Sequence, residues 1–188
     1  MNKRIIVVFF LFVSVHLFAQ AKTVLPPLDK SPMDMSYYPA GYPLLKIQGK
    51  MVEPLKMRII YGRPQLNGRR AFGEIRELKQ IWRLGANEAT EIEFFKDVRI
   101  DGKKVKKGRY TMYCIPDNDK WTMIINKETD TWGDFGYDST KDVLRVDVPT
   151  VKQSESTESL TIVFEKSATG ANMVTYWDDI KTSLPITF

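Results

Sequence analysis

The sequence has very little of the two side chains that most often carry catalysis and metal binding. Its 188 residues include a single cysteine, Cys114, and a single histidine, His16. A lone cysteine cannot form an internal disulfide, so stability must come from the core. His16 falls in an N-terminal segment that we expect to be removed. The remaining chain then cannot form a Ser-His-Asp triad, a Cys-His pair or a His-ligated metal site, and we expect no metal and no other cofactor.

Long apolar runs are equally scarce, and the one present begins near the N-terminus. Lys3 and Arg4 precede an apolar stretch over residues 5–18, and Ala19-Gln20-Ala21 supplies the small residues that signal peptidase recognises. The stretch is shorter than the roughly 20 residues of a membrane-spanning helix. We expect a signal peptide over residues 1–21, and a protein exported to the periplasm or the outer cell surface with no transmembrane segment after cleavage. An uncleaved N-terminal anchor is the alternative.

The chain also lacks a strong excess of either charge. Lys and Arg number 28 and Asp and Glu 23, which gives a formal net charge of +5. Basic and acidic residues are interspersed except in a run that follows the tight-turn pair Asp101-Gly102, and we interpret this run as a solvated hairpin rim. The run contains Lys103, Lys104, Lys106, Lys107 and Arg109. The weak charge and the pattern of elements predict no nucleic-acid partner.

Prolines are concentrated in one stretch, at positions 26, 27, 32, 39 and 43. Such a stretch is excluded from helices and central strands, so residues 22–45 are expected to form an extended lead-in. Tyr37, Tyr38 and Tyr42 indicate that its second half packs on the domain. Residues 46–188 are expected to form a single β domain.

Short apolar runs alternating with turn residues predict an all-β fold from residue 46 onward. We expect an antiparallel β-sandwich of jelly-roll or Ig-like type with about 8–9 strands, and a β-barrel is the alternative. One short helical insertion is predicted over Arg70 to Gln80, where Phe72, Ile75 and Leu78 have helix-like spacing. A polar loop is expected at 155–159. The expected strands are 55–61, 91–95, 97–100, 108–115, 120–126, 143–148, 160–165, 173–177 and 180–188.

Candidate binding residues lie between positions 61 and 90, where arginines alternate with glycines, aromatic residues and an amide. Arg63, Arg69 and Arg83 offer planar groups suited to a carboxylate or a phosphate. Asn87 and Glu88 could orient a ligand or hold those arginines. These five residues therefore form the candidate ligand-binding site.

A purely structural role for the same segment stays open. Glu74 and Glu88 could pair with Arg63 and Arg83 and pin long loops onto the sheet, because buried arginines need such partners. The size of Trp82 predicts that the block 82–90 is largely buried and that Arg83 is paired with a carboxylate, Glu88 and Glu74 being nearest in sequence.

Two further patterns give weaker support for a functional site. Asp130, Asp134 and Asp138 surround Trp132 but match no calcium-loop spacing, so a solvated, turn-rich loop is expected there. Cys114 lies in the middle of a predicted strand without a histidine to activate it, and it is expected to be a buried structural thiol.

Several motifs together resemble one known family, the domain of unknown function 2911. They are Tyr-Gly-Arg-Pro at 61–64, Gly-Arg with Phe-Gly-Glu at 68–74, Trp-Arg-Leu-Gly-Ala-Asn-Glu-Ala-Thr at 82–90 and Gly-Lys-Lys-Val-Lys-Lys-Gly-Arg-Tyr at 102–110. The resemblance covers nearly the whole chain after residue 21. It implies an exported bacterial protein with a single domain, and it supplies no substrate, cofactor or catalytic residue.

Two hypotheses for the function follow. The first is non-enzymatic binding of a small polar or anionic ligand, or of a cell-envelope partner, through the segment that holds Arg63, Arg83 and Glu88. The second is a histidine-free glycan hydrolase that uses paired carboxylates, with Glu88 opposite Glu74 or Asp134. Opposed carboxylates in an open cleft would favour the hydrolase, and carboxylates bound to arginines would favour binding or a structural role.

Overall fold

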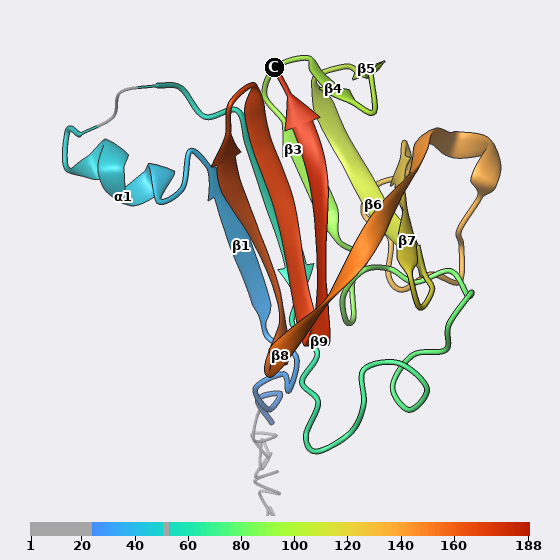
Figure 1. Cartoon of the computed structure of the whole chain (residues 1–188). Helices are drawn as coiled ribbons and strands as arrows, with labels where there is room; N and C mark the ends of the chain where they lie inside the picture. Colours follow the sequence, from blue (N-terminus) through green and yellow to red (C-terminus); the bar gives the residue numbers. More distant parts are fainter. Residues whose placement is uncertain (1–23, 51–52) are drawn as a thin grey trace, which may run out of the picture.

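The computed structural model describes residues 24–50 and 53–188, and the expected signal peptide at 1–21 lies outside them. The described chain is nearly all β (Figure 1). Its strands are β1 (Met33–Tyr38), β2 (Met57–Gly62), β3 (Glu91–Phe94), β4 (Val98–Ile100), β5 (Lys103–Val105), β6 (Gly108–Pro116), β7 (Lys120–Asn126), β8 (Asp142–Ser167) and β9 (Gly170–Thr187). The helices are α1 (Tyr42–Ile47) and the 3-10 turn η1 (Ser139–Lys141). No helix of the described residues is long and apolar enough to cross a bilayer.

The nine strands form one antiparallel sheet in the order β1-β2-β3-β6-β7-β8-β9-β4-β5. The ends of this order do not pair, so the sheet is open and the alternative of a closed barrel is wrong. The sheet turns back on itself along β8, and β1 lies beside the second half of β8 (Figure 1). A large apolar core fills the space inside this sandwich-like sheet, and Ala89, Tyr113 and Ile124 form a smaller separate cluster. The predicted all-β antiparallel class is thereby confirmed.

β8 and β9 are much longer than the sequence indicated. Residues 142–149 of β8 pair with β7, and from Thr150 onward β8 pairs with β9. The predicted polar loop at 155–159 is wrong, because these residues continue β8 through two shifts of register. Ser156 donates a hydrogen bond to the buried Asp178, at 3.2 Å, where β9 also bends. Exposed polar residues therefore continue the strand instead of ending it.

The proline-rich stretch contributes an edge strand. β1 lies between Pro32 and Pro39 and pairs with β2 along its whole length. Tyr38, at its end, is buried and donates a hydrogen bond to the carbonyl of Gly170 (3.1 Å). Beyond β1, α1 projects away from the sheet (Figure 1) and buries none of its residues.

The predicted helix over Arg70 to Gln80 is wrong. Gly73 and Lys79 have φ angles of 93° and 61°, which a right-handed helix does not contain. The segment instead folds into tight turns, with the amide of Gly73 bonded to the carbonyl of Arg76 (2.8 Å). The apolar spacing that suggested a helix reflects packing: Phe72 makes edge contacts with the rings of Trp82, Trp121 and Trp177. Among the described residues, the one α-helix is α1.

Candidate functional site

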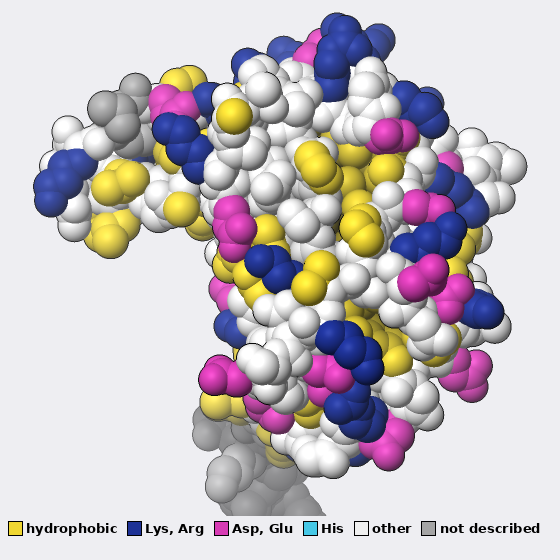
Figure 2. Space-filling view, in the orientation of Figure 1, with side chains coloured by type: hydrophobic (Ala, Val, Ile, Leu, Met, Phe, Trp, Pro, Cys, Tyr) yellow, Lys and Arg dark blue, Asp and Glu magenta, His cyan; other side chains and the backbone are white. Residues whose placement is uncertain are grey.

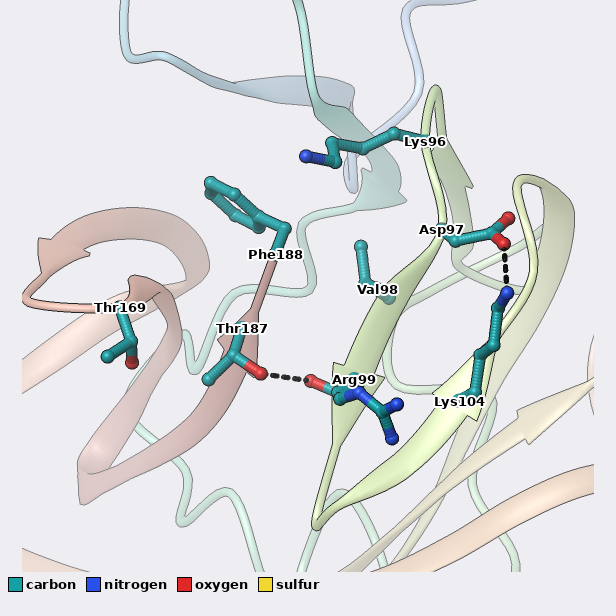
Figure 3. A pocket seen from close by; sticks show the side chains of 8 residues that line it. All are labelled: Lys96, Asp97, Val98, Arg99, Lys104, Thr169, Thr187 and Phe188. Atoms are coloured by element: carbon teal, nitrogen blue, oxygen red, sulfur yellow. Dashed lines mark hydrogen bonds and ion pairs between the residues drawn. The ribbon is translucent and has the colours of Figure 1, made fainter.

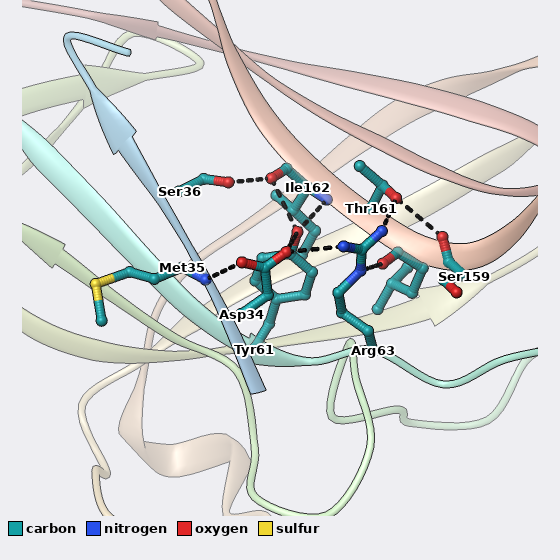
Figure 4. A network of polar contacts seen from close by, with 9 residues as sticks. Asp34, Met35, Ser36, Tyr61, Arg63, Ser159, Thr161 and Ile162 are labelled. Atoms are coloured by element: carbon teal, nitrogen blue, oxygen red, sulfur yellow. Dashed lines mark hydrogen bonds and ion pairs between the residues drawn. The ribbon is translucent and has the colours of Figure 1, made fainter. Parts of the chain in front are cut away.

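The segment of candidate residues, 61–90, starts at the place where the sheet turns back on itself. Figure 4 shows Tyr61 and Arg63 reaching from β2 to the free edge of β8. The Tyr61 hydroxyl accepts from the amide of Ile162 (3.0 Å) and donates to its carbonyl (3.2 Å). Arg63 donates to the carbonyl of Leu160 (2.9 Å) and the hydroxyl of Thr161 (2.8 Å).

Arg63 also pairs with Asp34 of β1 at 2.9 Å, so its guanidinium is engaged on three sides. Burial raises the pKa of Tyr61, which therefore stays a neutral hydroxyl that can both donate and accept. We call this contact between β2 and β8 the seam. It satisfies the backbone groups at the edge of β8, as a further strand would.

Arg69 lies apart from the other candidates. It is exposed, and it donates to the carbonyls of Leu66 (3.0 Å) and Gln65 (3.4 Å) in its own loop. Nothing in the geometry brings it to a hollow together with Arg63 or Arg83.

Arg83 lies in the block 82–90, which is largely buried as predicted. Its partner is a carboxylate, but it is Asp134, at 3.9 Å, and not Glu74 or Glu88. Arg76 shares the same carboxylate at 3.0 Å. The side chains of Arg83 and Asp134 are 19% and 14% exposed. Burial lowers the pKa of Arg83, and nearby Arg76 acts in the same direction.

Asn87 and Glu88 lie against the same loop as Asp134. The carbonyl of Asn87 accepts from the amide of Gly133 (2.9 Å), and Glu88 forms an isolated antiparallel bridge with Trp132. Asn87 has a φ of 61°, a left-handed conformation that asparagine tolerates better than most residues. The close approach of Gly62 to the carbonyl of Ala86 fixes this block against β2, since an added Cβ would lie only 2.2 Å from that oxygen. Asn87, Glu88 and Arg83 thus meet at the loop that follows β7.

That loop displays two aromatic side chains that the sequence analysis did not select. Trp132 is 61% exposed and Phe135 is 82% exposed, and their rings stack with centroids 5.9 Å apart. We call this pair the aromatic platform. The loop is solvated and rich in turns, as predicted, but the prediction did not include this exposed aromatic pair. The signal was available in the sequence: two large aromatic residues sit among turn-forming residues, where a core position is not expected.

The loop under the platform is tied down at several points. The amide of Ala89 bonds to the carbonyl of Thr131 (3.0 Å), and the amide of Asp130 to the carboxylate of Glu91 (2.6 Å). Arg109 joins both acids, at 3.0 Å from Glu91 and in a short contact with Asp130. Together with the Asp134 ion pairs, these bonds hold the aromatic pair in one position while its rings face water.

A hollow of about 350 Å³ opens beside Trp132, and we call it the acidic hollow. Its walls combine apolar side chains with carboxylates. They are Met33, Ile60, Glu88, Ala89, Glu91, Asp130, Thr131 and Trp132. Arg109 and Thr129 hold the pKa of Asp130 below its ordinary value, so this wall stays negatively charged at neutral pH.

A second hollow, of about 440 Å³, is lined by residues of β4, β5 and the end of β9 (Figure 3). Lys96, Arg99 and Lys104 line it with Asp97, Val98, Thr169, Thr187 and Phe188. We call it the basic hollow. Figure 2 shows Lys and Arg side chains gathered at this end of the molecule.

Catalytic chemistry finds little support among the described residues. No group of three or more His, Cys, Asp and Glu side chains is arranged to hold a metal there. Cys114 is buried, as predicted, and burial raises the pKa of its thiol well above the ordinary value. Of the carboxylates considered for a hydrolase, Asp134 is bound by Arg76 and Arg83, and Glu74 accepts from the amide of Arg70 at 2.6 Å.

Comparison with known proteins identifies a family but no characterised relative. Neither the curated proteins nor the solved structures include a match to this chain. The family model described as "Protein of unknown function (DUF2911)" matches residues 43–186. This range includes the aromatic platform, Tyr61 and Arg63 of the seam, and most residues that line the two hollows. The chain belongs to the DUF2911 family.

Proposed function

We propose that this protein is an exported, non-enzymatic binding domain and that the acidic hollow takes a small polar ligand against Trp132. The observation that carries the proposal is the aromatic platform: two large rings face water on a loop fixed by ion pairs and backbone hydrogen bonds. Large aromatic side chains contribute most to stability when they are buried, and their exposure on a fixed loop is typical of binding surfaces.

The lining of the acidic hollow selects the ligand by charge. An anion in this hollow would be repelled by the carboxylates of Glu88, Glu91 and Asp130. Arg109 offsets only part of their negative charge. An uncharged or cationic ligand with hydrogen-bond donors therefore fits better than an anion. One apolar or cationic face of that ligand would stack on the Trp132 ring.

Binding is favoured over hydrolysis because two of the three carboxylates that line the acidic hollow, Glu91 and Asp130, are engaged with Arg109. This leaves Glu88 without a free second carboxylate in this hollow. A glycosidase needs one carboxyl group as an acid and a second as a base or nucleophile. Arg109 binds both Glu91 and Asp130, and the lowered pKa of Asp130 is the opposite of what a general acid requires.

Trp132 itself provides the test. Trp82, Trp121 and Trp177 are at most 1% exposed, so acrylamide quenching of tryptophan fluorescence reports mainly on Trp132. The panel of probes contains neutral sugars, quaternary amines and citrate. We expect either the sugars or the amines to protect Trp132 from quenching, and we expect citrate not to protect it. Trp132→Phe removes the fluorophore, and loss of the quenching in this variant would identify Trp132 as the source of the signal.

Matched charge variants give the control. Glu88→Gln changes the rim of the acidic hollow, and Glu155→Gln makes the same change at an exposed site of β8. The first should weaken binding of the protective probe and the second should not. Protection by citrate, or equal effects of the two variants, would contradict the proposal.

Export rests on the pattern of residues 1–21 and is tested separately. N-terminal sequencing of the protein recovered outside the cytoplasm should find a start near Ala21 or Lys22. A start at Met1 would rule out cleavage.

A further inference from the structure

The ion pairs of this protein leave one end of it with uncompensated positive charge. Arginines in the described residues have a carboxylate partner within 4.0 Å, except Arg69 and Arg99. Arg69 donates to the carbonyls of Leu66 and Gln65 in its own loop. Arg99 uses one nitrogen on the carbonyl of Gly102 (3.0 Å), and the rest of its guanidinium is available at the basic hollow.

The lysines around Arg99 reinforce this excess. Lys96 lies over the ring of Phe188 at 5.5 Å and has no carboxylate partner among the described residues. Lys104 pairs with Asp97 at 2.6 Å, and the backbone amide of Lys107 takes the other oxygen of that carboxylate at 2.9 Å. The one carboxylate side chain lining the hollow is thus fully engaged. Lys103 lies on β5 and Lys106 and Lys107 follow it, and none of them has an ion pair with the part of the chain that the structure describes.

The side chains that line the hollow come from several segments of the chain. Figure 3 shows Lys96 extending towards Phe188 from one side, with Arg99 and Lys104 on the neighbouring strands β4 and β5. Thr169 lines the same space and adds a hydroxyl. A planar guanidinium with nearby ammonium groups and a hydroxyl matches the oxygens and multiple charge of a phosphate.

We propose that the basic hollow binds a phosphate group, carried by a lipid headgroup or by a soluble phosphate compound. This site is independent of the acidic hollow, whose lining repels anions. The two sites would let one domain hold an uncharged or cationic ligand while attached to a phosphate-bearing partner.

The test compares two pairs of neutralised cations in the full-length mature protein. One variant carries Lys96→Gln and Arg99→Gln. The matched control carries Lys79→Gln and Lys152→Gln, which lose the same charge around a separate hollow near Asp117. Binding is measured by sedimentation with vesicles of phosphatidylcholine alone or mixed with phosphatidylglycerol, and by calorimetry with pyrophosphate.

We expect the wild type to bind mixed vesicles, pyrophosphate or both, and not phosphatidylcholine alone. Binding to mixed vesicles only identifies a lipid headgroup, and binding to pyrophosphate only identifies a soluble phosphate compound. The Lys96/Arg99 variant should lose roughly 25-fold in affinity, about fivefold per cation, while the control changes less than about twofold. Binding of neither probe, or equal losses in the two variants, would overturn the proposal.

Discussion

The seam and the anchor of the aromatic platform both use arginines from one short segment, but they use them differently. The anchor is our name for the ion pairs that Arg76 and Arg83 both form with Asp134. Arg63 has a separate partner for each side of its guanidinium, at Asp34, Leu160 and Thr161. Arg83 shares Asp134 with Arg76, and its buried Nε has no partner among the described residues. Arg63 at the seam therefore contacts three different acceptors, whereas Arg76 and Arg83 at the anchor depend on the same carboxylate.

This difference separates the two roles left open by the sequence. The contacts of the seam join two parts of the sheet and leave Arg63 no room for a ligand. The contacts of the anchor hold a loop whose exposed rings have no evident structural use. Variants at the seam and at the anchor should therefore differ in how strongly they destabilise the protein and in which local contact they disturb.

Removal of the shared carboxylate should have the largest effect. Asp134→Ala leaves two half-buried guanidinium groups without a counter-charge, and we expect a loss of about 3 kcal/mol in the free energy of unfolding. Urea denaturation measures it, with the exposed Asp119→Ala as the control, expected to change stability by less than about 0.5 kcal/mol. A loss as small as that of the control would mean that water compensates both arginines and that the anchor is weak.

At the seam, Tyr61→Phe removes one hydroxyl that serves both backbone groups of Ile162. The buried amide of Ile162 would lose its partner, whereas its carbonyl keeps the hydroxyl of Ser36 as a donor (2.5 Å), so we expect a loss of about 1–2 kcal/mol. Tyr176→Phe, which removes an exposed hydroxyl bonded to Glu165 at 3.3 Å, is the matched control and should cost much less. Hydrogen exchange at Ile162 should accelerate in the first variant only; unchanged exchange would show that β1 and β2 cover β8 without this hydroxyl.

The two arginines themselves give a smaller and more direct contrast. Arg63→Met should destabilise by about 1–2 kcal/mol, because the carbonyl of Leu160 loses its donor. Arg83→Met should cost about 1 kcal/mol or less, because Asp134 keeps Arg76 and the burial of a charge is relieved. Thermal melting of both variants decides the order, and the reverse order would show that Arg83 is the stronger structural contact.

Acid should affect the platform. Arg109 and Thr129 hold the pKa of Asp130 below its ordinary value, so its contribution to the folded state is complete above the ordinary pKa of an aspartate and disappears as the pH falls through the lower pKa of the folded state. We expect quenching of Trp132 to be constant from neutral pH to about pH 4 and to change below it. In Asp130→Asn that change should vanish, and a transition near neutral pH would point to a different group.

The sequence predicted the class of fold because alternation and turn residues are local signals. It placed most strands, the buried block 82–90 and the buried Cys114 correctly. It misplaced the helix because Phe72, Ile75 and Leu78 have helical spacing for a reason that lies in the tertiary packing around three tryptophans. It also divided β8, because partners on β9 and in the 64–66 loop hold a polar strand that its own residues do not favour.

The candidate site was predicted in part. Arg83, Asn87 and Glu88 do converge, but their meeting point is set by Trp132 and Asp134, which lie far away in sequence. Long-range pairing of this kind has no local signature. Arg63 could not be distinguished from Arg83 by residue type, because only the position of the β8 edge decides that Arg63 uses each of its three nitrogens in a contact of the seam.

The position of β9 in the sheet has a consequence for synthesis of the protein. β9 pairs with both β8 and β4, and it carries Trp177, which stacks on Trp82 from a much earlier part of the chain. Until β9 has left the ribosome, the core has an open side and the β4–β5 hairpin lacks its neighbour. The nascent chain therefore cannot complete its fold stepwise from the N-terminus. Before β9 is made, the chain stays open to passage through an export channel, to binding by chaperones or to degradation.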